Sequence, residues 1–238
     1  MFIMYGFGMF FDPTMLIIIP GVILASIAQM KISTAYSQYS RISNSKGLRG
    51  SDVAINLLRI AGISDVSVEM IGGRLSDHYD PTKKVVRLSQ DVYAGNSIAS
   101  LSVAAHEVGH AIQHHYGYMP LTIRSSIAPI VGISSRLSWI LITIGLIFGF
   151  MGSSILMLKI GIFLFTAVVI FQLITLPVEF NASKRALDML EEYSFLQKNE
   201  INGSKKVLSA AALTYVAAAL TGILQLLRLV VILNSRED

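Results

Sequence analysis

Four long apolar runs constrain this chain more than any other feature of its sequence. They cover about residues 15–32, 127–150, 155–177 and 207–233. Each run is long enough to cross roughly 30 Å of hydrocarbon as an α-helix. With 53% hydrophobic and only 14% charged residues, the chain is too apolar for an ordinary soluble domain. We therefore expect a mainly α, integral membrane protein, built as a single membrane-embedded domain over residues 1–238 with about four transmembrane helices.

The basic residues predict how the chain is oriented. Four crossings place both termini on one side of the membrane and the polar segments 33–125 and 178–206 on the other. Most Lys and Arg residues fall in these two segments, and Lys31, Arg41 and Arg124 lie close to the spans. By the positive-inside rule, both segments are expected in the cytoplasm of a multi-pass cell-membrane protein.

Charge and cysteine usage exclude several other classes of function. The net charge of +4 is explained by this topology and by contact with anionic lipid, so we expect a lipid bilayer and no nucleic acid as partner. The chain has no cysteine, which excludes disulfides, thiolate zinc ligands and a cysteine nucleophile. Arg136, Lys159 and Arg228 lie within the apolar runs, where such long side chains can snorkel to the headgroups. The N-terminus lacks a basic region before its apolar run, so 15–32 is expected to be a retained anchor.

The segment between the first two spans is the only sizeable polar portion, and its pattern predicts a small cytoplasmic α+β unit. A short helix capped near Ser51 is expected to end before Gly62. Alternation over 66–71 predicts a strand, and 74–77 can pair with 85–88 around a turn. The edge strand of such a hairpin is a natural groove for an extended peptide backbone.

An HExxH motif, His106-Glu107-Val108-Gly109-His110, lies in the same portion. On a helix, residues i and i+4 share one face, so His106 and His110 can bind one metal ion. Glu107 projects beside them and can take a proton from a metal-activated water as the general base. The motif therefore predicts a zinc site with two histidine ligands and a catalytic glutamate. Because these five residues also occur by chance, a plain helical surface pair is the alternative.

The flanking residues place the motif in the middle of a helix. Asn96-Ser97 can cap a helix whose apolar body runs to about His115. In a helix interior Gly109 costs roughly 1 kcal/mol relative to Ala, so we expect a close approach there by another helix or by substrate backbone. His114 and His115 are interpreted as surface residues, because three histidines on consecutive turns of a straight helix do not converge easily on one tetrahedral ion.

Zinc held by two histidines needs a third protein ligand and an open position for water. A histidine ten residues after His106 would mark the extended HExxHxxGxxH class, but that position is Tyr116. The HExxH helix is too short and polar to be a span, which disfavours an intramembrane-cleaving enzyme. Glu179 is the remaining candidate, since it leaves the third span on the same predicted side as the motif. Without the motif, a solvated glutamate at a helix end would be the simpler interpretation.

Three segments together resemble one protein family. They are 106–113 with the sequence HEVGHAIQ, 179–186 with EFNASKRA, and 210–218 with AAALTYVAA. They are similar to those of the YugP-like bacterial membrane zinc metallopeptidases, also described as the putative neutral zinc metallopeptidase family, and the similarity covers nearly the whole chain. More distantly, HExxH followed by EFxA resembles the HtpX-type and CAAX-prenyl membrane proteases, whose third ligand is the glutamate of an ExxxD motif.

The resemblance implies Zn²⁺ as the cofactor, His106, His110 and Glu179 as its ligands, and Glu107 as the base. One position departs from the distant relatives, because Ser183 stands where they have Asp. That Asp would orient a ligand histidine. We expect Asp188 or a backbone carbonyl to replace it.

The sequence therefore predicts a membrane-bound, zinc-dependent endopeptidase of gluzincin type that hydrolyses peptide or membrane-protein substrates. The alternative is a non-catalytic membrane scaffold or assembly factor with a structural or vestigial metal site. A structural site would fill all four coordination positions with protein ligands, whereas three are identified. His78 and Tyr215 are candidates for stabilising the oxyanion, although turn exposure and helix packing are simpler roles for them. The chain is also compatible with a membrane-protein partner or a homo-oligomer.

Overall fold

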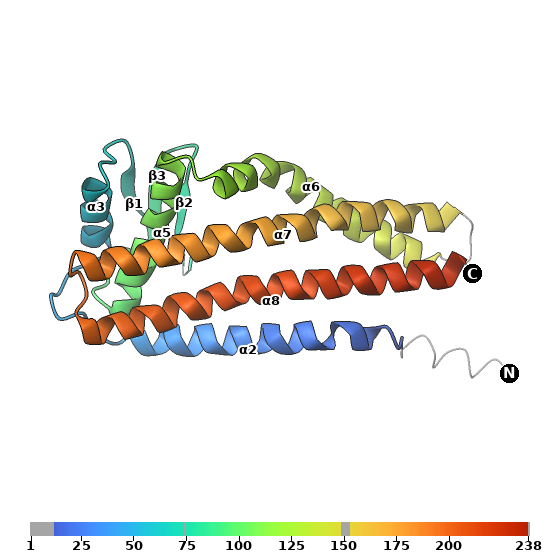
Figure 1. Ribbon diagram of the computed structural model, residues 1–238, viewed down its shortest axis with the longest axis horizontal. Helices are drawn as coiled ribbons and strands as arrows, with labels where there is room; N and C mark the ends of the chain where they lie inside the picture. The colour runs from blue at the N-terminus through green and yellow to red at the C-terminus, as the bar shows by residue number, and fades with distance from the viewer. Residues whose placement is uncertain (1–11, 74, 149–152, 238) are drawn as a thin grey trace. The chain divides into compact units, whose positions relative to one another are not determined.

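The chain is mainly helical and carries one small sheet (Figure 1). A computed structural model describes residues 12–73, 75–148 and 153–237. The helices are α2 Met15–Tyr39, α3 Gly50–Ile60, α4 Gln90–Tyr93, α5 Ile98–His115, α6 Met119–Ile147, α7 Ser153–Glu192 and α8 Lys198–Glu237, and the strands are β1 Ser67–Ile71, β2 His78–Asp80 and β3 Val85–Ser89.

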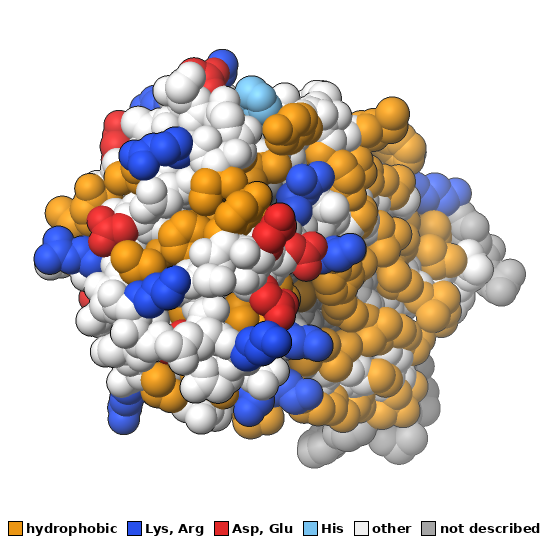
Figure 2. Space-filling model, turned by 60° about the vertical axis from the view of Figure 1, so that its left-hand side comes forward, with side chains coloured by type: hydrophobic (Ala, Val, Ile, Leu, Met, Phe, Trp, Pro, Cys, Tyr) orange, Lys and Arg blue, Asp and Glu red, His pale blue; other side chains and the backbone are white. Residues whose placement is uncertain are grey.

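Four helices, α2, α6, α7 and α8, are long and apolar enough to cross a membrane. This confirms the prediction of four candidate membrane-spanning helices. All four extend beyond the apolar runs that predicted them; α7, for example, continues from its apolar part to Glu192. Residues 149 and 150, at the end of the predicted span 127–150, lie outside the described residues. Figure 2 shows two different surfaces. One is a face on which charged side chains of both signs are interspersed, and the other is a flank that is largely hydrophobic.

The described chain divides into two compact units, and each of the four long helices contributes to both. The first unit comprises the described residues up to Ile27, Arg124–Ile174, and those from Val216 onward. Its core is formed by apolar side chains of α6, α7 and α8, namely Ile142, Leu158, Ile162, Phe165, Val169 and Leu229.

One ion pair in the first unit involves a charge inside an apolar helix. Arg228 of α8 is 9% exposed, and its guanidinium donates to the Asp12 carboxylate at 2.7 Å and to the Thr14 hydroxyl at 3.1 Å. The sequence predicted only that Arg228 snorkels to the headgroups. The structure adds a specific acidic partner just before α2, which compensates part of the cost of burying the charge.

The second unit, Ala28–Ile123 with Thr175–Tyr215, contains the sheet and the HExxH helix. Its core is formed by the apolar faces of α3, α5 and β3 together with parts of α7 and α8. Fully buried members include Val53 and Leu57 of α3, Val86 and Leu88 of β3, Leu101 and Val108 of α5, and Leu190 of α7. Helix α5 therefore runs through the middle of this core, which fixes the position of the residues it carries.

Both helices predicted in this unit form, because their first turns are capped, but the N-cap of α3 is Arg49 and the predicted cap Ser51 lies inside the helix. Helix α5 begins after Ser97, whose hydroxyl accepts from the Ser100 backbone N–H at 3.0 Å. Helix α3 begins after Arg49, whose backbone N–H donates to the Asp52 carboxylate at 3.0 Å.

The sheet has the strand order β1-β3-β2. Strand β1 pairs in parallel with β3, with Ser67 opposite Val85, and β2 pairs antiparallel with β3, with His78 opposite Arg87. The predicted hairpin strand 74–77 is wrong for residues 75–77, and residue 74 lies outside the described residues; the strand that pairs antiparallel with β3 is His78–Asp80. Asp77 instead caps the end of β3, where its carboxylate accepts from the Ser89 backbone N–H at 2.7 Å and from the Ser89 hydroxyl.

Candidate metal centre

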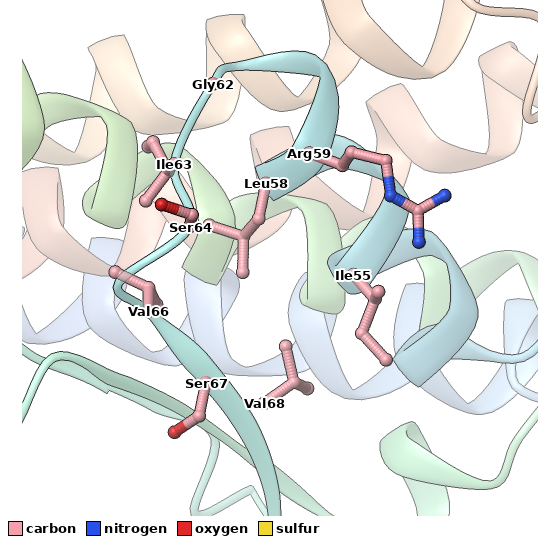
Figure 3. Close-up of a pocket in the computed structure, with 9 residues that line it drawn as sticks. All are labelled: Ile55, Leu58, Arg59, Gly62, Ile63, Ser64, Val66, Ser67 and Val68. Atoms are coloured by element: carbon pink, nitrogen blue, oxygen red, sulfur yellow. The ribbon is translucent and has the colours of Figure 1, made fainter.

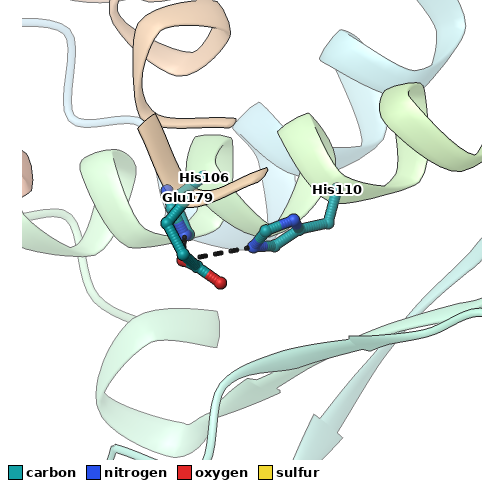
Figure 4. A group of neighbouring side chains, drawn as sticks. All are labelled: His106, His110 and Glu179. Carbon is teal, nitrogen blue, oxygen red and sulfur yellow. Dashed lines mark hydrogen bonds and ion pairs between the residues drawn. The ribbon is translucent and has the colours of Figure 1, made fainter. Parts of the chain in front are cut away.

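Two helices of the second unit bring three potential metal ligands together (Figure 4). His106 and His110 lie one turn apart on α5, and Glu179 lies on α7. One ligand atom from each side chain lies within 4.8 Å of the other two. Glu179 Oε2 is 3.3 Å from His106 Nε2 and 3.7 Å from His110 Nε2. These are the three residues that the sequence and the family resemblance indicated as ligands.

The close approach of α5 and α7 depends on Gly109. A Cβ atom at this position would lie 2.8 Å from the Ala182 carbonyl oxygen and 3.2 Å from Ala182 Cα. Real Cβ atoms do not approach backbone so closely, so any larger residue would push the helices apart. The expected close approach at Gly109 is therefore that of another helix. It brings the α7 residue Glu179 within reach of the two histidines.

The distances from Glu179 Oε2 to the two histidine nitrogens fit a zinc ion. Donor atoms about 2.0–2.1 Å from one tetrahedral zinc ion lie roughly 3.4 Å apart. The two distances from Glu179 Oε2, 3.3 Å and 3.7 Å, bracket this value. Two imidazole nitrogens and one carboxylate oxygen are also a usual donor set for catalytic zinc, with a fourth position left for water or substrate.

Burial and charge favour a cation at this centre. Glu179 is 2% exposed and Glu107 is 8% exposed, so two carboxylates are withdrawn from water next to the histidines. Burial alone would lower the pKa of His110, but its hydrogen bond with Glu179 and the charges of Glu107 and Glu179 outweigh burial and raise that pKa. A divalent cation would supply the positive charge that these groups attract.

The Nδ1 atom of each histidine has its own hydrogen-bond partner. His106 Nδ1 lies 3.2 Å from the Ser183 hydroxyl, and His110 Nδ1 lies 3.0 Å from Gln113 Oε1. Asp188, which the sequence suggested as a substitute for the missing Asp, is exposed and makes neither contact. Gln113 was part of the segment that carried the resemblance, but its role could not be inferred, because its other partners are on α7.

A cleft of about 680 Å³ reaches the centre at His106 and Glu107. The Glu107 carboxylate makes no hydrogen bond or ion pair with a residue in the described parts of the chain. The walls come from α2, α5, α8 and the loop before β2, with Ile32, Tyr36, Arg41, Leu75, Asp77, Val103, Val207, Leu208, Ala211 and Tyr215 among the lining residues. The Glu107 carboxylate therefore borders both the cleft and the group of candidate ligands.

Four other residues that the sequence analysis considered, Tyr215, His78, His114 and His115, do not all lie near the metal centre. Tyr215 lines the cleft, whereas His78 is not among its lining residues; the His78 Nδ1 atom is 2.7 Å from the Ser76 carbonyl oxygen. His114 and His115 are exposed, and His114 Nδ1 lies 2.8 Å from the Tyr79 hydroxyl. Of these four residues, only Tyr215 shares the cleft with the HExxH residues.

A second hollow, of about 440 Å³, lies between α3 and β1 (Figure 3). Its lining is mostly aliphatic, and Arg59 is the charged residue in it; the lining residues are Ile55, Leu58, Arg59, Gly62, Ile63, Ser64, Val66, Ser67 and Val68. Because these residues include no histidine or carboxylate, this hollow offers no ligand for a metal ion.

Four described helices able to span a membrane and a His-His-Glu group that could hold a metal ion fit a membrane metalloprotein, and sequence comparison agrees with this class. The chain belongs to the putative neutral zinc metallopeptidase family, which it matches over residues 14–234. It is 50% identical, over 212 residues, to the putative membrane protease YugP of Bacillus subtilis (strain 168). The aligned region covers 89% of this chain and 92% of that relative. No solved structure matches the chain.

Proposed function

We propose that this protein is a zinc-dependent endopeptidase of the cell membrane, with His106, His110 and Glu179 as the metal ligands and Glu107 as the general base. The observation that carries the proposal is the convergence of the three ligand atoms within 4.8 Å, beside a cleft that Glu107 also lines. Membership of the zinc metallopeptidase family supports the same metal and the same class of reaction.

The chemistry follows from the placement of these groups. Zinc, when bound, polarises a scissile carbonyl and lowers the pKa of a coordinated water towards neutrality. Glu107 accepts a proton from the attacking water and then passes it to the leaving amine. Glu179 and the two histidines would hold the metal; Glu179 and His110 are buried, and His106 also lines the cleft. Tyr215, which lines the same cleft, is our candidate donor of a hydrogen bond to the substrate oxyanion.

A purely structural metal site is the weaker interpretation. Such sites are closed by four protein ligands, whereas the group found within the described residues has three. In addition, a structural site gains nothing from a carboxylate such as Glu107 that lines a cleft next to a ligand. For these reasons a scaffold or assembly factor with a vestigial site is not preferred.

The cleft indicates a polypeptide substrate that meets the enzyme at the membrane. Its walls include Ile32 and Tyr36 of α2 and Leu208 and Ala211 of α8, and both helices are candidate membrane spans. An unfolded peptide, or a segment of a membrane protein that leaves the bilayer, would find apolar contacts there. We place this face of a single membrane-embedded domain in the cytoplasm, because Lys31 and Arg41 flank the first span.

Metal removal and restoration on the purified protein in detergent test this proposal. We expect cleavage of an unfolded protein substrate to stop when a chelator removes the metal and to return when zinc is added. A protein that cleaves equally well after complete removal of zinc would contradict the proposed function.

A further inference from the structure

Gln113 is the one fully buried amide that contacts a histidine of the metal centre among the described residues. Its side chain lies between α5, which carries it, and α7, which carries Glu179. Gln113 Oε1 is 3.0 Å from His110 Nδ1, and Gln113 Nε2 donates to the Val178 carbonyl at 2.8 Å and to Asn181 Oδ1 at 3.0 Å. An amide with partners at both ends in a 0% exposed position has little freedom to rotate.

The partners decide which end of the amide faces His110. The Val178 carbonyl oxygen can only accept a hydrogen bond, so the Gln113 atom beside it is the NH₂ group. Asn181 presents its oxygen in the same way, because Asn181 Oδ1 also accepts from Arg185 Nε at 2.8 Å, and a guanidinium can only donate. The remaining atom, which faces His110, is therefore the carbonyl oxygen.

This orientation fixes the protonation of His110. An amide oxygen can only accept, so His110 Nδ1 must carry the hydrogen. The lone pair of the neutral imidazole is then on Nε2, the atom that lies 3.7 Å from Glu179 Oε2 in the metal centre. The contact of His106 differs, because the Ser183 hydroxyl can donate to or accept from His106 Nδ1.

We propose that Gln113 is a positioning residue that holds His110 in the tautomer and orientation needed for metal binding, and that Asn181 and Arg185 hold Gln113 in turn. The inference rests on the proposed metal site. It assigns the orientation of His110 to this Gln113–Asn181–Arg185 chain, whereas His106 is contacted by the hydroxyl of Ser183. Because Asn181 and Arg185 lie on α7, the chain also couples the two helices that supply the ligands.

Gln113→Met tests the proposal, since it keeps the approximate volume and removes both the acceptor and the donors. We expect zinc affinity to fall by about 10- to 100-fold, as is usual when a group that orients a ligand is lost. In the metal-free proteins at alkaline pH, imidazole ¹⁵N chemical shifts should identify His110 as the Nδ1–H tautomer in the wild type and as a mixture in Gln113→Met. Unchanged affinity would overturn the proposal. So would lost affinity with an unchanged tautomer, or an Nε2–H tautomer in the wild type.

A matched pair at Asn181 keeps the test decisive if Gln113→Met does not fold. Asn181→Asp retains an oxygen that accepts from both Gln113 and Arg185, whereas Asn181→Leu removes it. We expect Asn181→Asp to bind zinc much as the wild type does and Asn181→Leu to lose affinity and the single tautomer. Equal behaviour of the two variants would overturn the proposal. The tautomer is read in metal-free protein, so this result stands apart from whether zinc supports cleavage.

Discussion

At the scale of single residues, the metal centre depends on one carboxylate that approaches from a second helix. Glu179 Oε2 is 3.3 Å from His106 Nε2, whereas His114 is exposed and pairs with Tyr79. We predict that Glu179→Ala weakens zinc binding by more than the ~100-fold that marks the upper range for residues that only orient a ligand. His114→Ala should leave zinc binding unchanged.

Ser183→Ala completes this series of variants. The Ser183 hydroxyl contacts His106 Nδ1 but is not one of the three candidate zinc ligands. Its loss should therefore weaken zinc binding by about 10-fold. Zinc titration of Glu179→Ala, Ser183→Ala and His114→Ala in detergent measures how much zinc affinity each variant loses. A series in which His114→Ala is the most damaging would move the third ligand onto α5.

The ease of predicting each residue follows from the distance along the chain to its partners. The HExxH residues could be recognised because helical geometry alone places i and i+4 on one face. Glu179 is 73 residues from His106, and only topology and family resemblance indicated it. Gln113 bonds to residues 65 and 68 positions away, so no local pattern shows its role.

At the scale of elements, the centre depends on how closely α5 and α7 pack. We predict that Gly109→Ala weakens zinc binding and lowers the melting temperature, because the added Cβ would lie 2.8 Å from the Ala182 carbonyl oxygen and force α7 away. The gain in helix propensity, roughly 1 kcal/mol, does not offset such a displacement of backbone.

Gly132→Ala is the matched control for this substitution. Gly132 lies inside helix α6, and a Cβ there would meet nothing within 4 Å. We expect unchanged zinc affinity and a helix stabilised by up to about 1 kcal/mol. Equal effects of Gly109→Ala and Gly132→Ala on zinc binding would show that helix approach at Gly109 does not position the ligands.

The ion pair of Asp12 with α8 makes a prediction for acid stability. The hydrogen bond from Arg228 holds the pKa of Asp12 below its ordinary value of 3.8. A carboxyl whose pKa is lowered on folding stabilises the fold fully above its ordinary pKa, and this contribution is lost as the pH falls through the lowered value. Asp12→Asn should therefore reduce thermal stability near neutral pH and flatten the loss of stability below about pH 4. If the wild type and Asp12→Asn lose thermal stability equally steeply below about pH 4, the ion pair of Asp12 and Arg228 does not contribute to acid stability in this way.

The elements themselves were predicted with uneven success, for physical reasons. Helices α3 and α5 were predicted because their caps and apolar faces are local features of the sequence. The hairpin strand was assigned to 74–77 instead of His78–Asp80. The pairing register depends on β3 and on the capping of Ser89 by Asp77, which are tertiary contacts that alternation of polar and apolar residues does not encode.

At the scale of the whole molecule, the proposed site requires both polar segments on one side of the membrane. The chain has no cysteine, so single substitutions Lys46→Cys, Lys198→Cys and Ser235→Cys give clean accessibility probes. All three positions are exposed. We predict that Lys46→Cys and Lys198→Cys are labelled from the cytoplasm and Ser235→Cys from the opposite side. Labelling of the first two from opposite sides would exclude Glu179 as a ligand.

Composition and charge were sufficient to predict four candidate spans, because hydrocarbon thickness sets the length of a crossing helix. They could not show that the helices extend past the apolar runs. Those extensions carry Glu179 on α7 and the cleft residue Tyr36 on α2, whereas the cleft residues Leu208 and Ala211 lie inside the fourth apolar run. One candidate ligand and part of the cleft thus come from continuations of spanning helices, which hydropathy does not delimit.

Zinc content and peptide cleavage, measured together on the wild type and Glu107→Gln, test the central claim most directly. Glu107 lines the cleft without being one of the three grouped ligands. We predict that Glu107→Gln binds zinc like the wild type and loses cleavage by at least the ~100- to 10,000-fold typical of removing a general base. Glu191 is an exposed carboxylate on α7, so Glu191→Gln serves as the control. This variant should retain both zinc binding and cleavage. Wild-type turnover in Glu107→Gln with zinc bound would contradict the account.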